Sequence, residues 1–545
     1  MSLINLNLTD AGWHTSSTGL HHIRGCAYLG NEKLINNALA ERLFPATAPS
    51  DRWHKTLNEL NGFYALVTQS EENLVAAVDH IRSIPLFYGQ ISGQLFLSDD
   101  AEWVRRQVGD AEMDPVARQE FQLTGYVTGQ DTLFPNLKQL QAGECLIATG
   151  SDDGIKLETQ RYYRFLHSEP ADYSEPELQE ELDSVALASM RRLTDYAGGR
   201  QIVVPLSGGY DSRLIVAMLK RLGYSNILTF TYGVPGNKES QYSKRVAEAL
   251  GLDWHFIEYS NELWLETWQS DARWEYQKWA SGWSSLAHIQ DWPAVAALRD
   301  RNLIENDAVF VPGHAGDFVA GSHIPEEAKP GSTASVRELK EAILTKHYSL
   351  APFRFISTYS QDFWTTKIQS QSELSKIEKG EDLANAFEKW DWQERQAKYI
   401  ANSVRVYEDF GYDWWMPLWD KEFVEFWENV PLRLRRGRTW YNSFVESFFA
   451  FYADILSEPV TGNAEQSGFL HSLAKKILYS VPGGRTTIKA LKPILSTNKH
   501  PLAFHSIFDK KLIKKGYKFN GLQAYCFLSE MHNDQGTSKK PEFKL

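Results

Sequence analysis

Residues 203–213 read VVPLSGGYDSR, and this stretch decides how the rest of the sequence is interpreted. The apolar, β-branched run ending at Leu206 is typical of a buried parallel strand, and residues 214–219 (LIVAML) continue as a buried helix. The turn between them points backbone N–H groups and hydroxyls at an anion near the helix N-terminus. A carboxylate beside a phosphate repels it, and a bridging Mg²⁺ resolves that conflict. The sequence therefore predicts a phosphate site at Ser207, Gly208, Gly209 and Ser212, with Asp211 as a Mg²⁺ ligand.

This turn is not a Walker-type loop, because no lysine follows Gly209. The string Ser-Gly-Gly-x-Asp-Ser resembles instead the pyrophosphate-binding loop of enzymes that split ATP into AMP and pyrophosphate. The alternative is a glycine-rich strand–helix turn without chemical meaning. The complete string in a strand–helix context favours the binding interpretation.

Length and composition bound the remaining possibilities. A chain of 545 residues suggests two to four domains, and a net charge of −12 argues against a general nucleic-acid binder. No stretch approaches the ~20 apolar residues of a membrane span, and the first residues lack the basic segment and apolar core of a signal peptide. Three widely spaced cysteines give no disulfide framework or zinc pattern, which favours a reducing cytoplasm.

The chain divides into three predicted parts. Residues 1–168 contain short strands separated by polar turns, and a polar linker with two prolines follows. Residues 177–480 open with a helix, continue as a strand–helix alternation that implies a parallel sheet, and become helical and rich in Trp after about residue 262. Residues 481–545 form a C-terminal extension with a disordered end.

Three further strings precede the phosphate loop: LNGF at 60–63, DHIRSIPLFY at 79–88 and TLFPNLKQLQAG at 132–143. In this order, ahead of the loop, they resemble the asparagine synthetase family, over residues from about 60 to about 430. The resemblance implies an α/β protein. It begins with an αββα sandwich of the N-terminal-nucleophile amidotransferase type. A parallel-sheet ATP-pyrophosphatase domain (adenine nucleotide α hydrolase-like) with a helical extension follows.

The resemblance does not extend to the residues that hydrolyse and bind glutamine in this family. A glutaminase of this family has Cys directly after the initiator Met, with the free α-amine as its base. Here Ser2 stands at that position, and the glutamine-holding strings Arg-Gly-Pro-Asp and Asn-Gly-Glu-Ile-Tyr are missing before Leu60. Neither Cys26 nor Cys145 has an N-terminal amine. We expect a glutaminase-like domain that has lost hydrolysis, with Ser2 as a nucleophile left open, and ammonia or an amine as nitrogen donor.

The resemblance also assigns the ATP site. Ligands of parallel sheets lie at the carboxyl ends of strands, which places Leu206, Tyr232 and Gly233 near the adenosine half of ATP. After a short strand at 308–312, Gly313 joins the ATP site and Asp317 falls on the aspartate that shares Mg²⁺ with Asp211. The alternative for Asp317 is a helix cap.

His314 stands where the family usually has a Glu that handles the proton of the attacking amine. Histidine performs such transfers near neutral pH. The alternative is a histidine that only bonds its own turn. No lysine aligns with the family's pyrophosphate lysine, because VTGN occupies 460–463; Lys475, Lys476 or one of the arginines at 433–438 are candidates, each of them otherwise a solvated basic residue. The MPLWD string at 416–420 is expected to pack and to carry no chemistry.

The sequence thus predicts a cytoplasmic, AMP- and pyrophosphate-forming carbon–nitrogen ligase that uses ATP and Mg²⁺. It adenylates a small-molecule or peptide carboxylate, by default aspartate in asparagine biosynthesis, for attack by ammonia or an amine. A lactam-forming or sugar-amidating relative is an alternative, and a catalytically dead scaffold is an alternative of another class. Neither nucleic acid nor membrane is an expected partner. The oligomeric state is open, with a homodimer among the options.

Overall fold

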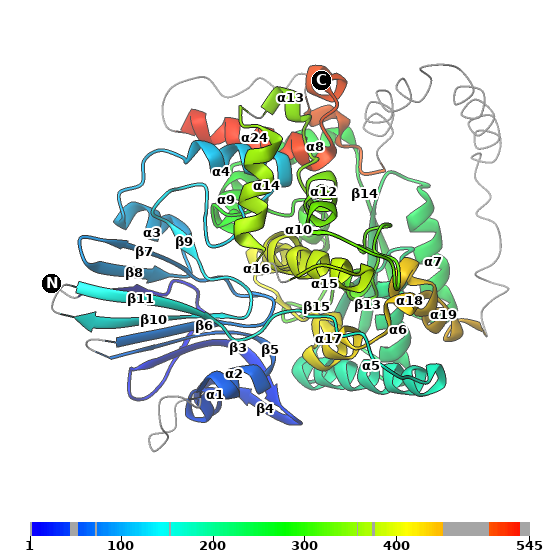
Figure 1. Cartoon of the computed structure of the whole chain (residues 1–545). Helices are drawn as coiled ribbons and strands as arrows, with labels where there is room; N and C mark the ends of the chain where they lie inside the picture. Colours follow the sequence, from blue (N-terminus) through cyan, green and yellow to red (C-terminus); the bar gives the residue numbers. More distant parts are fainter. Residues whose placement is uncertain are drawn as a thin grey trace.

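The computed structural model describes residues 3–43, 53–70, 73–151, 154–356, 358–372, 376–450, 501–508 and 510–534. Several predictions concern residues outside these ranges: the nucleophile alternative Ser2, the lysine candidates Lys475 and Lys476, and the disordered end. The described residues form two units that pack against each other (Figure 1).

The first unit contains two β-sheets. The smaller has the order β1-β8-β7-β9, and the larger has the order β11-β10-β6-β5-β3-β2 with β4 beside β3. The strands are β1 (Ile4–Asn7), β2 (His14–Thr15), β3 (His21–Leu29), β4 (Glu32–Ile35), β5 (Asn61–Gln69), β6 (Asn73–Val78), β7 (Phe87–Ile91), β8 (Gln94–Ser98), β9 (Lys138–Gln139), β10 (Glu144–Ser151) and β11 (Gly154–Arg161).

Side-chain alternation along the strands produces four layers. In β8, Phe96 packs outward against α3 (Ala101–Gln107) and α4 (Pro115–Thr124), whereas Leu95 and Leu97 face the larger sheet. The outer face of the larger sheet packs on α1 (Asn36–Leu43) and α2 (Trp53–Glu59). Figure 1 shows the two helix pairs on opposite sides of the stacked sheets. The predicted αββα sandwich is confirmed.

The second unit is built on a sheet of the order β14-β13-β12-β15-β16 in which each pairing is parallel. Its strands are β12 (Ile202–Pro205), β13 (Ile227–Gly233), β14 (Asp253–Glu258), β15 (Val309–Phe310) and β16 (Asp413–Trp414). The chain builds outward from β12 through β13 to β14 and then returns to the other side of β12 as β15. The crevice at the carboxyl ends of β12 and β15 is therefore a topological switch point, where open parallel sheets bind ligands.

Helices surround this sheet and extend it. They are α5 (Glu175–Ala197), α6 (Tyr210–Arg221), α7 (Lys238–Leu250), α8 (Asn261–Gln269), α9 (Asp271–Ser281), α10 (Trp292–Asp300), α11 (Gly316–Val319), α12 (Val336–Lys346), α13 (Phe353–Ile356), α14 (Gln361–Gln371), α15 (Gly380–Asp391), η2 (Trp392–Ile400), η3 (Ala401–Val404), α16 (Arg405–Asp409), η4 (Pro417–Trp419), α17 (Lys421–Glu428), α18 (Leu432–Arg435), η5 (Arg436–Arg438), α19 (Thr439–Ser447), η7 (Phe504–Ile507), α23 (Lys510–Lys515) and α24 (Phe519–Asp534). η2 is a π-helix, a form that is frequent at functional sites.

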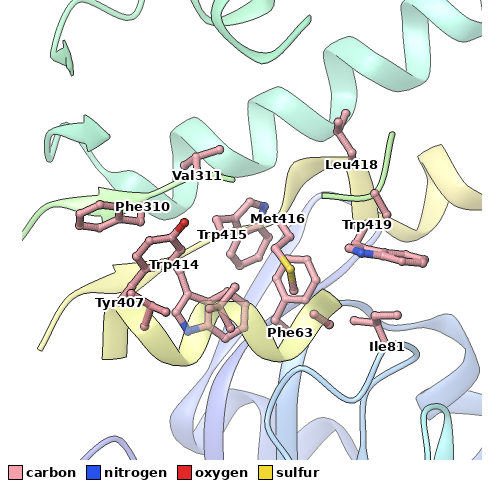
Figure 2. Packing of buried hydrophobic residues seen from close by; sticks show 14 of the residues in the cluster. Phe63, Ile81, Phe310, Val311, Tyr407, Trp414, Trp415, Met416, Leu418 and Trp419 are labelled. Atoms are coloured by element: carbon pink, nitrogen blue, oxygen red, sulfur yellow. The ribbon is translucent and has the colours of Figure 1, made fainter. Parts of the chain in front are cut away.

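The two units share one core. Figure 2 shows Phe63 of the first unit among Trp414, Trp415 and Met416 of the second, and Ile81 of the first unit on the side of Trp419. The rings of Phe63 and Trp415 pack edge to face with centroids 4.7 Å apart. The expectation that the MPLWD string packs is borne out, since Met416, Leu418 and Trp419 are fully buried.

A buried ion pair adds a polar contact to this boundary. Arg192 of α5 donates through Nε to Asp420 Oδ2 at 2.6 Å, and the two side chains are 7% and 1% exposed. Asn61 Nδ2 donates to the other Asp420 oxygen at 3.0 Å. The carboxylate that closes the MPLWD string is therefore held by both units.

The arginines at 433–438 do not form a uniformly solvated stretch. Arg435 is completely buried and pairs with buried Glu388, so the solvated interpretation is wrong for this residue. Burial favours the neutral carboxyl and raises the pKa of Glu388 to about 7, although the Arg435 charge opposes that shift. A charge at this depth persists only because it is paired.

Candidate active site at the carboxyl ends of the parallel strands

Three loops meet where the strands of the parallel sheet end. They follow β12, β13 and β15, and they contain the residues that the sequence singled out. Gly313 shows how closely two of them approach, because a Cβ added there would lie 3.0 Å from the backbone nitrogen of Ser212 and 3.3 Å from Cβ of Asp211. Only glycine fits that contact without displacing the phosphate loop.

The loop after β12 presents unused donors. Gly209 is the N-cap of the 12-residue helix α6, and no side chain caps that terminus. Ser207 Oγ instead accepts from the Gly209 amide at 3.0 Å and lies 3.4 Å from Ser212 Oγ. The amides of the first turn of α6 thus remain for an anion, and the helix dipole favours negative charge there.

Asp211 and Asp317 stand together at the switch point. The backbone amide of Asp317 donates to Asp211 Oδ2 at 3.2 Å, and Tyr441 Oη donates to Asp211 Oδ1 at 2.9 Å. Burial, and then the charge of Asp317, raise the pKa of Asp211 to about 7. Burial alone would raise the pKa of Asp317 as well, but hydrogen bonding and charge from His323 lower it to about 2.

This pair fits Mg²⁺. Burial is the larger cause of the raised pKa of Asp211 and the charge of Asp317 is the second, and a divalent cation beside the pair would offset both. Asp317 Oδ1 accepts no hydrogen bond from a described residue and is free to be a ligand. Within the described ranges no three acidic, His or Cys side chains gather as a metal site. Magnesium does not require three, because phosphates and water complete its six ligands.

Neither alternative of the sequence holds at the loop after β15. Asp317 is not a helix cap, since α11 begins at Gly316 and its N-cap is Ala315. His314 does not bond its own turn; its Nε2 lies 2.8 Å from Oγ of Ser403 in η3. Burial, and then the neighbouring His288, lower the pKa of His314 to about 4, so the ring is neutral at pH 7.

The loop after β13 adjoins the C-terminal segment. The Leu206 amide donates to Phe230 O at 2.8 Å, which joins the ends of β12 and β13. Gly233 has a φ of +133°, and an added Cβ would lie 2.8 Å from Pro501 O. Tyr232 stacks on Tyr259 with ring centroids 4.9 Å apart, and its hydroxyl donates to Asp291. The Tyr232 ring is therefore held in place, and its hydroxyl is already engaged.

Of the residues that support the carboxylate pair, the sequence offered Arg438 only as one of the arginines at 433–438, and it did not offer Tyr441. Arg438 acts electrostatically on both Asp211 and Asp317, and it is the member of the arginine run that adjoins the phosphate loop, 5.9 Å from the Tyr210 ring. Tyr441, three residues further on, carried no signal at all. Membership of a basic run was the only signal for Arg438.

A second polar group links Asp317 to the π-helix. His323 Nε2 lies 3.6 Å from Asp317 Oδ2, and its Nδ1 bonds Asp391 at the end of α15. Burial disfavours the charged ring, but Asp391 and Asp317 together raise the pKa of His323. Arg395, on η2, makes no hydrogen bond to a described residue, and its charge lowers the pKa of both Asp317 and His314. It is thus a spare guanidinium beside both residues.

The thiols of the first unit are inert. Cys26 and Cys145 are 2% and 0% exposed, and burial raises the pKa of each to about 12. Cys145 Sγ faces Gln160 O at 3.2 Å. Neither thiol can replace an N-terminal cysteine nucleophile.

Comparison with known families agrees with this two-part arrangement. Residues 47–163 match the glutamine amidotransferase domain, and residues 189–442 match asparagine synthase. The fold is that of an α/β protein in which an amidotransferase-type sandwich precedes a parallel sheet. The chain carries the domains, in the order, of an asparagine synthetase-like protein, and its asparagine synthase domain supports a ligase activity.

Other comparisons add little. Curated proteins give no match. The solved allosteric regulatory enzyme of purine biosynthesis is 14% identical, with a TM-score of 0.18 over 62% of this chain, and the chain spans 59% of its length. NH3-dependent NAD synthetase from Campylobacter jejuni is 15% identical (TM-score 0.20, 36% of this chain and 85% of that one). NMN synthetase from Francisella tularensis is 13% identical (TM-score 0.21, 42% and 97%). No helix within the described ranges is long and apolar enough to cross a membrane.

Proposed function

We propose that this protein is an ATP-dependent amide ligase that splits ATP into AMP and pyrophosphate, adenylates a carboxylate and transfers the acyl group to ammonia or an amine. The asparagine synthase match supports a ligase in general terms. The observation that carries the finer proposal is the contact of Asp317, through its backbone amide, with the Asp211 carboxylate, beside the uncapped N-terminus of α6. Such a pair serves a magnesium-bound polyphosphate.

In this proposal ATP lies across the ends of β12 and β13, with Leu206, Tyr232, Gly233 and Gly313 around its nucleoside and α-phosphate. The amides of α6 and the hydroxyls of Ser207 and Ser212 hold the pyrophosphate end. Asp211 and Asp317 would hold Mg²⁺, which neutralises the phosphate charge when bound. Arg438 adds positive charge on the same side and takes the part of the lysine that the sequence did not reveal.

The acyl side of the site is assigned to His314 and Arg395. The substrate carboxylate attacks the α-phosphorus, and pyrophosphate leaves. An amine then attacks the acyl carbon, AMP leaves, and the amine must lose a proton. Neutral His314, oriented by Ser403, would accept that proton, and the unpaired guanidinium of Arg395 would hold an acidic group of the acyl substrate. Oriented donors and charges supply most of the acceleration in such a site.

The nitrogen donor in this proposal is ammonia or an amine, and glutamine is excluded. The amidotransferase match begins only at residue 47, and both thiols of the first unit are buried with raised pKa values. Aspartate is the default acyl substrate; closure of a lactam or amidation of a sugar acid are alternatives within the same chemistry. The enzyme is assigned to the cytoplasm, in keeping with its three free cysteines.

The test measures AMP and pyrophosphate release from Mg·ATP with aspartate, comparing ammonium with glutamine as donor. We expect turnover with ammonium and none above background with glutamine. Equal turnover with both donors would overturn the silent first unit and return attention to Ser2. Binding of Mg·ATP without turnover would retain the ligase and exclude aspartate. Absence of Mg·ATP binding would favour a dead scaffold.

A further inference from the structure

A cavity of about 200 Å³ lies between the two units, away from the strand-end site. We call it the interface cavity. No residue of the phosphate loop contributes to it. The first unit contributes Thr9, Asp10, Arg24, Arg82, Pro85, Phe87 and Asp99, and the second contributes Trp279, Ala280, Ser281, Gly282, Ser284, Asn402 and Arg405.

Arg82 on one wall is a buried charge with unused donors. Its side chain belongs to a residue that is 2% exposed, and its hydrogen bonding to described residues is limited to Nε, which donates to Leu140 O at 2.9 Å. Nη2 is buried without a partner among them. Its φ of +57° lies in the left-handed region that glycine favours. The unfavourable burial and backbone conformation of Arg82 together indicate a functional role beyond packing.

Arg405, on the opposite wall, is also a buried charge with an unpaired donor. It is 3% exposed, its Nη2 donates to Ser83 O at 2.5 Å, and its Nη1 pairs with Glu408. Its Nε has no partner among the described residues. Burial, and then the charge of Arg405, lower the pKa of Arg82 to about 9, which leaves both arginines protonated at neutral pH. Three arginines therefore line one cavity, of which Arg24 and Arg405 pair with Glu408 and Arg82 has no ion-pair partner among the described residues.

The acidic residues of the cavity are already occupied. Asp99 accepts from the amides of Thr9 and Asp10, from Thr9 Oγ1 and from Trp13 Nε1. Asp10 accepts from the Gly12 amide and pairs with Arg24 at 2.9 Å. Surplus donors with no surplus acceptors favour a ligand that brings oxygen acceptors and negative charge. The volume equals about six to seven water molecules at ~30 Å³ each, which limits the ligand to a small anion.

We propose that the interface cavity binds a small oxyanion, a carboxylate or a phosphate, through Arg82 and Arg405. The site does not depend on the ligase proposal, but it adjoins the strand-end site. Asn402 and Arg405, which line the cavity, flank Ser403, and Ser403 bonds His314 at 2.8 Å. An anion in the cavity therefore fixes the same short helical segment that orients His314.

The experiment is calorimetric titration of the full-length protein, without ATP, by inorganic phosphate and separately by malonate. We expect saturable binding of at least one anion, and the stronger of the two identifies the ligand chemistry. Arg82→Gln is expected to weaken it at least tenfold. Arg106→Gln, an arginine whose side chain is 71% exposed on α3, serves as the matched control and should bind as the wild type does. Circular dichroism verifies the fold of each variant.

A second variant separates the cavity from the phosphate loop. Ser212→Ala should leave the Arg82-dependent binding intact, because Ser212 lies at the strand ends and does not line the interface cavity. Loss of binding in Ser212→Ala with retention in Arg82→Gln would overturn the proposal, as would absence of binding by the wild type. If Arg82→Gln does not fold, Arg82→Lys, which keeps the charge but loses the planar pair of donors, should weaken binding at least threefold, and unchanged binding there would overturn the proposal.

Discussion

Both units of this molecule have a buried hydrophobic core. They differ in whether their reactive side chains are available to a ligand. In the parallel-sheet unit, three strand ends converge on polar groups that have no hydrogen-bond partner among the described residues: the amides of the first turn of α6, Asp317 Oδ1 and the Arg395 guanidinium. In the sandwich the two thiols, Cys26 and Cys145, are both buried. One unit keeps polar groups available for a ligand, whereas the other has its thiols enclosed in packing.

This difference explains why a sandwich without a usable thiol would remain in the chain. Its strand ends hold the second unit in place. His80 Nε2 bonds Trp419 O at 2.7 Å, and the Lys421 amide donates to Asn61 Oδ1 at 2.8 Å. Removal of the sandwich would take Phe63 and Ile81 out of the boundary core that Figure 2 shows. Structural necessity and catalytic necessity are thus separable here, and three predictions test that separation.

The largest effect is expected at the carboxylate pair. Asp211→Asn keeps the size of the side chain and its contact with Tyr441 but removes the charge. AMP formation should fall about 10²–10³-fold in kcat, because charge stabilisation at the phosphates is lost. Steady-state AMP release under saturating Mg·ATP measures it.

The matched control for this change is Asp183→Asn, a partly exposed aspartate on α5 that pairs with Arg221. It should change the same rate by less than about twofold, since exposed pairs contribute little. If the Asp211→Asn enzyme kept a third of its activity, the Asp211 charge would not be required for AMP formation, and the functional contrast between the two units would be lost.

The sequence predicted the parts of the strand-end site that are formed by residues contiguous in the chain. The strand, turn and helix at 202–221 follow from β-branched residues, glycines and an apolar run that are contiguous in the chain. The αββα sandwich followed from a resemblance carried by three strings, not from strand periodicity. The residues that complete the site are distant: Tyr441 meets Asp211 across 230 positions, and His323 meets Asp391 across 68. No local pattern encodes contacts between side chains so far apart.

Local sequence patterns also failed to predict which residues are buried. A run of arginines at 433–438 has the composition of a solvated stretch, yet Arg435 is completely buried beside Glu388 while Arg433 is exposed and pairs with Glu175. The difference arises because α18 turns one face toward the core, and a short helix of four residues gives too little periodicity to show which face that is.

An intermediate effect is expected at the boundary between the units. Arg192→Met leaves the buried Asp420 carboxylate without its cation, at a cost of about 3 kcal/mol in the free energy of unfolding. Urea unfolding followed by tryptophan fluorescence measures the change. Arg221→Met, which breaks the exposed pair with Asp183, should cost less than about 1 kcal/mol. Equal costs would mean that the buried pair of Arg192 and Asp420 contributes no more to stability than an exposed pair.

The smallest effect is expected from the thiols. In a Cys526→Ser background, replacing Cys26 and Cys145 by Ala should change ammonium-dependent AMP formation by less than about twofold, because neither thiol touches the strand-end site. With both cysteines present, alkylation by iodoacetamide at pH 8 should run at least about 10³-fold slower than for a free thiol, since a pKa of about 12 leaves few thiolates. The rate should rise with pH, because deprotonation of these thiols is completed only above pH 12. Fast labelling of either cysteine at pH 8, together with loss of glutamine-dependent activity on its removal, would give the sandwich a nucleophile after all and erase the contrast between the two units.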